Sequence, residues 1–290
     1  MRLVPGLSKW LTRYLWRSKR LPIQEPDANV EVILTLPDGR KLSVNELRGL
    51  SGTVNFREGK LLGVTGAVRY EIIGTGSISP AATSLHQQGR KAGERGDYKT
   101  AIDFFEQASE VAPTWPFPHY DRAYTHMLLD DFDAARFHYQ KTVELSPRGF
   151  FTAITALSTL DREKNGELPR GTYLGYVLLE GLEPPQRESA LRTLVERLPQ
   201  FAPGWKEFAS LCDDDDERLA AIERGLNAQP DAETKGMLEI NKALVLNLKG
   251  EHSAARQRLG ELALDPNSTF GTEHSAKAAL SILMMKGTMS

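Results

Sequence analysis

Residues 93–113 read GERGDYKTAIDFFEQASEVAP, and the spacing of their small and aromatic residues decides the fold. Ala101 and Ala108 flank Phe105 at helical spacing, and Pro113 ends the pattern. Residues 128–147, LLDDFDAARFHYQKTVELSP, repeat the pattern at an offset of 34 residues. The matched pairs are Gly96 with Asp130, Tyr98 with Phe132, Ala101 with Ala135, Phe105 with Tyr139, Ala108 with Thr142, and Pro113 with Pro147. Six pairs in one register indicate a structural repeat.

This register resembles the tetratricopeptide repeat (TPR), a 34-residue unit of two antiparallel helices. Units at residues 82–115 and 116–149 carry suitable packing residues in their first helices, namely Leu85, Gly89, Ala92 and Ala123. Small residues such as Ala101 and Ala135 let paired helices approach closely, while Phe105 and Tyr139 fill the space beside them. Proline then stops the second helix. One hairpin cannot bury its own apolar face, so at least three stacked units are expected.

Weaker units follow, and together they predict a mainly α, TPR-like solenoid over residues 77–290. Residues 237–247 and 248–266 match well as one helix pair. Residues 188–203 and 217–230 each match a second helix, with only a short helix at 205–211 between them. Helices are also predicted at 150–164, ended by Asn165 and Gly166, and at 172–182. A closing helix is predicted at 274–286, after degenerate units that reach about residue 266.

Residues 25–76 differ in kind and predict a small antiparallel β module. The segment 30–44 contains two strand-like runs around Pro37, Asp38 and Gly39, which is a hairpin signal. Further short strands are expected at 53–56, 60–64 and 67–73, separated by glycine-containing turns. Residues 74–80, GTGSISP, form the expected linker to the helices.

Residues 1–24 form a basic amphipathic segment with six cationic side chains and no acid, although the whole chain has a net charge of −2. Its apolar residues recur every three or four positions, which predicts a short helix. The residues expected to act in membrane binding or targeting are Arg2, Lys9, Trp10, Arg13, Trp16 and Arg17. One interpretation is an anionic membrane surface, or organelle targeting in a eukaryote. The alternatives are docking on the acidic repeat body and disorder. A cytoplasmic or peripheral membrane location is expected.

The composition and the scattered reactive residues do not favour an enzyme. The chain has 290 residues, and its small net charge gives no basic field for nucleic acid. Cys212 is the single cysteine, which excludes multi-cysteine metal sites, and its acidic neighbours disfavour a thiolate. Residues 213–216 are four aspartates, expected to favour the N-terminus of the following helix rather than to bind calcium. His119 and His126 lie two helical turns apart, too far to share one ion. No cofactor is expected.

The resemblance places a concave groove along the first helices of the units. The positions expected to line it are His86, Arg90, Phe117, Tyr120, Asp121, Tyr124, Met127, Tyr173 and Tyr176. Tyrosines offer large contact area at small entropic cost, which favours a peptide or an extended protein segment as ligand. The alternative is that these rings pack against the helix at 150–164 and fill the groove. Some TPR proteins hold a partner's terminal carboxylate with lysine and asparagine, but His86 and Asp121 stand at those positions here.

The sequence therefore predicts a non-enzymatic protein–protein interaction scaffold. The alternative function is a peripheral membrane-associated assembly or regulatory factor, anchored by residues 1–24.

Overall fold

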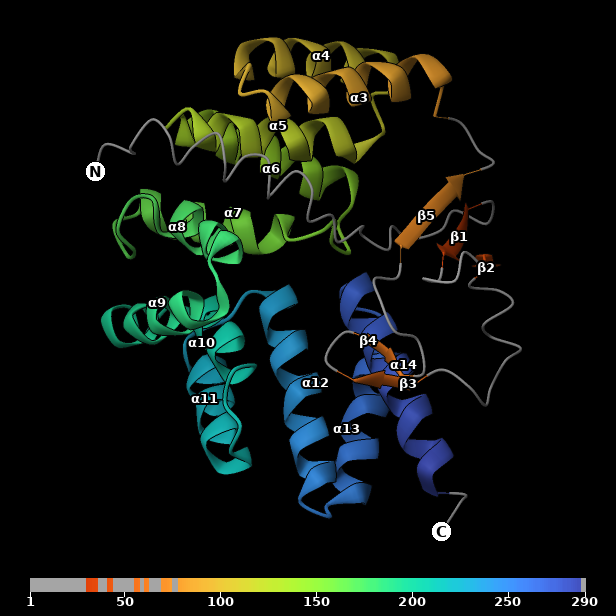
Figure 1. Cartoon of the computed structure of the whole chain (residues 1–290), viewed down its shortest axis with the longest axis vertical. Coiled ribbons are helices and arrows are strands. Elements are labelled where there is room, and N and C mark those ends of the chain that lie inside the picture. Colours follow the sequence, from red (N-terminus) through yellow and green to blue (C-terminus); the bar gives the residue numbers. More distant parts are fainter. Residues whose placement is uncertain are drawn as a thin grey trace.

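The computed structural model of the protein describes residues 78–287 and five short strands within residues 30–74 (Figure 1). The strands are β1 (Val30–Thr35), β2 (Lys41–Ser43), β3 (Asn55–Arg57), β4 (Lys60–Leu62) and β5 (Arg69–Gly74). The helices are α3 (Pro80–Glu94), α4 (Tyr98–Val111), α5 (Pro116–Leu128), α6 (Phe132–Leu145), α7 (Ala153–Lys164), α8 (Thr172–Leu178), the 3₁₀ turn η1 (Leu179–Gly181), α9 (Pro184–Arg197), α10 (Ala202–Ala209), α11 (Asp215–Asn227), α12 (Ala232–Leu248), α13 (His252–Leu264) and α14 (Phe270–Gly287).

The strands form two small antiparallel sheets, whereas the sequence predicted one. β1 pairs with both β2 and β5, which gives the strand order β2-β1-β5, and β3 pairs only with β4. In the first sheet Leu34 lies opposite Leu42 on one side and opposite Tyr70 on the other. That residues 25–76 make up a module of their own stays a prediction.

The first hairpin, α3 and α4, is set by its caps and by one close contact. The Ser79 hydroxyl accepts from the Ala82 N–H before α3, and Asp97 accepts from the Thr100 N–H before α4. Between α3 and α4, Gly96 takes a left-handed φ of 79°. A Cβ placed on Gly89 would lie 2.6 Å from Phe105 Cε1, so the two helices approach more closely than any larger residue allows. The predicted role of a small residue facing Phe105 is confirmed.

The second hairpin repeats the first in the predicted register. Ala135 and Tyr139 are buried where Ala101 and Phe105 are buried in the first unit. Asp131 accepts from the Ala134 N–H and caps α6 as Asp97 caps α4. The two units stack, because α4 packs on α5.

The regular stack changes after α6. Gly149 and Phe151 have left-handed φ values of 102° and 51°, so the helix predicted from residue 150 begins only at Ala153. It ends at Lys164, followed by Asn165 and a left-handed Gly166, as predicted. The helix predicted at 172–182 is broken into the short α8 and η1.

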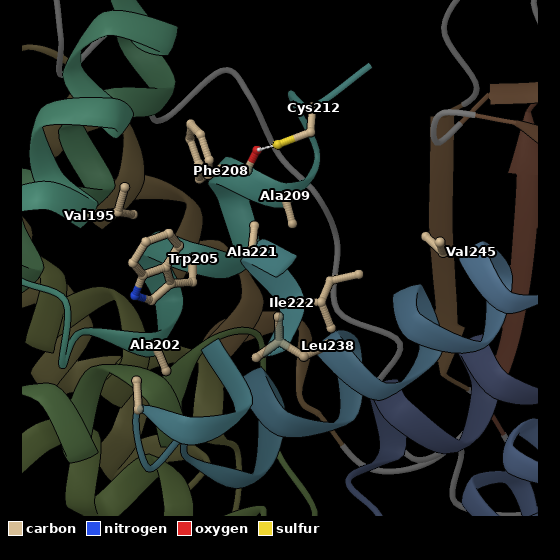
Figure 2. Close-up of a cluster of buried hydrophobic side chains, with 11 residues drawn as sticks. Val195, Ala202, Trp205, Phe208, Ala209, Cys212, Ala221, Ile222, Leu238 and Val245 are labelled. Carbon is tan, nitrogen blue, oxygen red and sulfur yellow. Dashed lines mark hydrogen bonds between the residues drawn. The ribbon is translucent and has the colours of Figure 1, made fainter. Parts of the chain in front are cut away.

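The C-terminal half contains its own cores. Trp205 and Phe208 of α10 pack with Ile222 of α11 and Leu238 of α12 (Figure 2). A short helix is present as predicted, but α10 begins at Ala202 and ends at Ala209, whereas the prediction placed it at 205–211. α13 and α14 bury a second cluster with α12, so α14 closes the stack as expected.

A polar junction joins the two halves of the solenoid. The Thr155 N–H at the start of α7 donates to Glu233 Oε2 at 3.0 Å, and the Thr155 hydroxyl donates to Asp231 Oδ1 at 2.9 Å. The Phe270 N–H donates to the Arg148 carbonyl at 2.7 Å, and Arg148 also pairs with Glu273. α12 therefore packs against α7, although 67 residues of chain separate Lys164 from Ala232 (Figure 1).

Candidate functional site

A continuous row of aromatic rings runs from α5 across the loop before α7 to α8 and the start of α10. Successive ring centroids lie between 4.8 and 6.2 Å apart. This aromatic row consists of Phe117, Phe150, Phe151, Tyr120, Tyr139, Tyr173, Tyr176 and Phe201. Most contacts are edge-to-face, the arrangement that aromatic quadrupoles favour.

The aromatic row has a buried half and a partly exposed half. Phe150, Tyr139, Tyr173 and Phe201 are each no more than 1% exposed, and they belong to the core. The remaining rings are half-buried and form the outer rings, namely Phe117, Tyr120, Phe151 and Tyr176. The expectation that Met127 and Tyr173 line an exposed groove is therefore wrong, because both side chains are enclosed by the packing of α5 and α6 with α7 and α8.

Hydrogen bonds fix the tyrosines of the row. The hydroxyls of Tyr120 and Tyr173 lie 3.0 and 2.9 Å from the same oxygen, Thr152 Oγ1. Burial raises the pKa of both phenols well above the usual range, so they remain protonated and able to donate. The Tyr176 hydroxyl donates to Glu207 Oε1 at 3.2 Å. These hydrogen bonds fix the positions of the three tyrosine rings.

Tyr176 also belongs to a charged cluster with α9 and α10. Arg187 donates to Glu207 Oε2 at 2.7 Å, and Lys206 Nζ lies 3.2 Å from Glu207 Oε1. The Lys206 ammonium also lies 6.0 Å from the centre of the Tyr176 ring, within range for a cation–π contact. One carboxylate therefore shares two cations beside the last outer ring.

A second charged cluster lies at the other end, between α3 and α5. His86 Nε2 lies 2.8 Å from Asp121 Oδ2, and Arg90 Nε lies 3.7 Å from the same oxygen. His86 and Asp121 are buried, so they hold the first two hairpins together rather than stand open in a groove as predicted. The His86 ring also packs edge-on against Phe117, with centroids 5.3 Å apart.

Much of this geometry agrees with the alternative interpretation, in which the rings pack against the helix predicted at 150–164 and fill the groove. Tyr120 and half-buried Tyr124 pack in one cluster with Ala153, Ala156 and Leu160. Whether the outer rings also bind a partner stays a prediction.

Several residues of the site were missed by sequence reasoning. Phe150 and Phe151 were assigned to a helix, although they form the middle of the row. The signal was the adjacent pair of phenylalanines directly after Pro147, Arg148 and Gly149, where the TPR register leaves a loop. Thr152 and Glu207, which fix the tyrosine hydroxyls, gave no sequence signal.

Other predicted features were placed as follows. Asp214 caps α11, and the next three acids lie in its first turn, as expected of residues 213–216. Cys212 is buried, burial raises the pKa of its thiol, and its sulfur lies 3.5 Å from the Phe208 carbonyl oxygen (Figure 2). Among the residues that the structure describes, no three His, Cys, Asp or Glu side chains converge on a metal site.

The predicted membrane or targeting residues all lie outside the described residues, so their role stays a prediction; they are Arg2, Lys9, Trp10, Arg13, Trp16 and Arg17. No helix within the described part is both long and apolar enough to cross a bilayer.

The first two hairpins described above repeat at an offset of 34 residues, with small residues facing large rings. The chain has the tetratricopeptide-repeat fold. No family model matches the sequence, and no curated protein matches it. Among solved structures, the chain is similar to the MamA RS-1 ArsTM double mutant, at 14% identity over 70% of this chain and 98% of that one, with a TM-score of 0.32.

It is also similar to TTC0263, a thermophilic TPR protein of Thermus thermophilus, at 20% identity over 69% of this chain and 99% of that one, with a TM-score of 0.29. A third similar structure is YrrB, described as a TPR protein with an unusual peptide-binding site, at 15% identity, 68% and 92% coverage and a TM-score of 0.30. The identities and TM-scores of these three structures are low, so the TPR fold of this chain rests on the register and packing of its own hairpins.

Proposed function

We propose that this protein is a non-enzymatic protein-interaction scaffold that binds an extended protein segment along the outer rings of the aromatic row. The observation that carries this proposal is that four half-buried rings belong to one aromatic row, namely Phe117 and Tyr120 of α5, Phe151 of the loop before α7, and Tyr176 of α8. The first three contact one another in series, and Tyr176 joins them through the buried rings of Tyr139 and Tyr173.

The chemistry of the row suits a peptide. Half-buried aromatic rings present apolar area, and their fixed rotamers reduce the entropy lost on binding. Phe151 supports this interpretation, because a bulky residue with a φ of 51° is strained and such strain is concentrated at functional sites. The partly exposed charged cluster of Arg187, Lys206 and Glu207 beside Tyr176 gives a bound segment polar contacts at one end of the row.

The test is a selection of random peptides displayed on phage against the full chain, followed by affinity measurement on the selected peptides. Phe151→Ala removes one outer ring and should weaken binding about tenfold or more, as expected for an aromatic hot spot. The matched control is Phe137→Ala, because Phe137 is 53% exposed on α6 and is not part of the row. Its affinity should stay within about twofold of the wild type.

A second variant separates the ring from its hydroxyl. Tyr176→Phe keeps the ring and removes its bond to Glu207, so it should reduce affinity less than Tyr176→Ala does. Failure to select any peptide, or equal weakening by the Phe151 and Phe137 substitutions, would overturn the proposal.

We also propose peripheral membrane association through residues 1–24, on the basis of their six cations and regular apolar spacing. The full chain should sediment with anionic vesicles at low salt and be released at high salt, because the attraction is screened. Failure to sediment at low salt would exclude it.

A further inference from the structure

Three histidines of the second unit form a histidine column between α5 and α6. His119 and His126 lie two turns apart on α5, and His138 of α6 lies between them. The ring centroids of His119 and His126 are 5.6 and 5.5 Å from that of His138, and the rings are nearly parallel, at 22° and 15°. The prediction that His119 and His126 cannot share an ion is consistent with this spacing, but it missed the ring that joins them.

His119 and His138 are joined by one hydrogen bond between imidazoles. Their Nδ1 atoms are 3.3 Å apart. The two ring centroids are 5.6 Å apart, which exceeds the 3.3 Å between the Nδ1 atoms by about the width of one ring. The two Nδ1 atoms therefore lie on the line between the centroids and face each other. One Nδ1 must carry a hydrogen while the other offers its lone pair. The bond survives the uptake of one proton by the pair, but a second proton places N–H against N–H and breaks it.

The surroundings of the column disfavour protonation. Burial is the main cause that lowers the pKa of all three rings, and for His138 it lowers the value to about 3. Arg122 of α5 adds like charge near each ring, and Lys141 of α6 adds to the effect on His119.

Few acids are placed to offset these cations. Glu106 of α4 is paired with Arg122, at 3.1 Å. Asp131, at the start of α6, has its Oδ2 3.3 Å from His126 Nδ1 and opposes the shift there.

We propose that the histidine column is an acid-sensitive element that loosens the α5–α6 hairpin when the pH falls below about 6.5, the ordinary pKa of histidine. The neutral rings fit together between the helices, whereas two or more imidazolium ions beside Arg122 repel one another. α5 also carries Phe117 and Tyr120, so the same loosening should weaken binding at the aromatic row. This last consequence rests on the proposed function; the opening of the hairpin does not.

The sign of the pH effect follows from linkage. A histidine whose pKa is lowered in the folded state contributes its full stability above the unfolded pKa of 6.5, and loses it as the pH falls toward the folded value. In the open state a histidine has its ordinary pKa of about 6.5, so at pH 5.5 its protonated form outnumbers its neutral form about tenfold. One histidine that stays neutral in the closed state, such as His138, therefore lowers the ratio of closed to open hairpin about tenfold. His119 and His126 should act in the same direction.

The test is hydrogen exchange of the full chain, measured by mass spectrometry at pH 7.5 and pH 5.5 and corrected for intrinsic exchange rates. Protection of the α5 and α6 amides should fall at least about tenfold at the lower pH. In His138→Gln this fall should shrink by about that factor. The matched control is His252→Gln, because His252 is exposed on α13 and bonds only to Asn247 within the described part; it should keep the full fall.

An unchanged protection of α5 and α6 between the two pH values would overturn the proposal, as would the same fall in wild type and His138→Gln. If His138→Gln does not fold, NMR titration of the wild-type imidazoles decides. A His138 ring that stays neutral at pH 5.5 supports the proposal, and one that titrates at or above pH 6.5 refutes it. These measurements need no peptide, so their outcome is independent of the proposed binding function.

Discussion

The contact between Gly89 of α3 and Phe105 of α4 gives the sharpest prediction about stability. A Cβ on Gly89 would lie 2.6 and 2.7 Å from two atoms of the Phe105 ring and 3.1 Å from the Ala101 carbonyl oxygen. Phe105 is fully buried, so its ring cannot swing out into solvent to make room. Gly89→Ala should therefore force α3 and α4 apart, at a cost of about 1–3 kcal/mol for overpacking.

The replacement of glycine by alanine inside a helix also has a favourable term, about 1 kcal/mol from helix propensity. Gly260→Ala isolates that term, because Gly260 is inside α13 and a Cβ there would meet nothing within 4 Å. We expect Gly260→Ala to raise the free energy of unfolding by up to about 1 kcal/mol. The difference between the two variants should then equal the overpacking cost, about 1–3 kcal/mol.

Urea unfolding followed by circular dichroism measures both variants under the same conditions. Hydrogen exchange of the α3 and α4 amides should show that the loss in Gly89→Ala is local to the first hairpin. Equal changes in stability for Gly89→Ala and Gly260→Ala would refute the reasoning, since the Phe105 contact would then carry no cost.

Three further predictions concern charge and backbone strain. Burial raises the pKa of Glu233 to about 8, so its contribution to stability is present below its unfolded pKa of about 4.5 and is lost as the pH rises toward 8. The free energy of unfolding of Glu233→Gln should therefore rise relative to that of the wild type between pH 5 and 8, by up to about 1.4 kcal/mol per pH unit, as measured by urea unfolding at several pH values. A difference between variant and wild type that stays constant with pH would contradict this. Asp121→Ala leaves His86 and Arg90 without their shared carboxylate and should cost about 1.5–3 kcal/mol in the same assay, whereas no loss would show that the cluster is solvated. Gln229 has a φ of 52° and follows Ala228, the C-cap of α11, so Gln229→Gly should raise the thermal midpoint, equivalent to about 0.5–1 kcal/mol; a lower midpoint would show that chain entropy outweighs the relieved strain.

The sequence predicted the hairpins well wherever local and tertiary signals agree. In the first two units, the small residues and the buried rings recur at one spacing, and the structure confirms both. The pattern first fails at residues 149–151, because Gly149 and Phe151 leave the helical region of φ and ψ, at a point where Gly149 lies close to the distant residues Glu233 and Thr269.

The candidate site was predicted only in part. The tyrosines at helical spacing on α5 were identified, but spacing alone does not say which rings are covered. Tyr173 and Met127 lie on the predicted faces and are buried all the same, because α7 packs over α6 and brings its own side chains against them.

By itself the sequence determined the repeat length, the register of the helix pairs and the small residues at their contacts, since each depends on residues within about 34 positions of one another. Only the tertiary structure decided three features: the polar junction of α7 with α12, the aromatic row and the histidine column. The histidine column depends on how α5 and α6 pack within one hairpin, whereas the polar junction and the aromatic row bring together elements whose relative placement follows from the angle at which the repeats stack. That angle is a sum of many packing contacts and is not encoded at any one position.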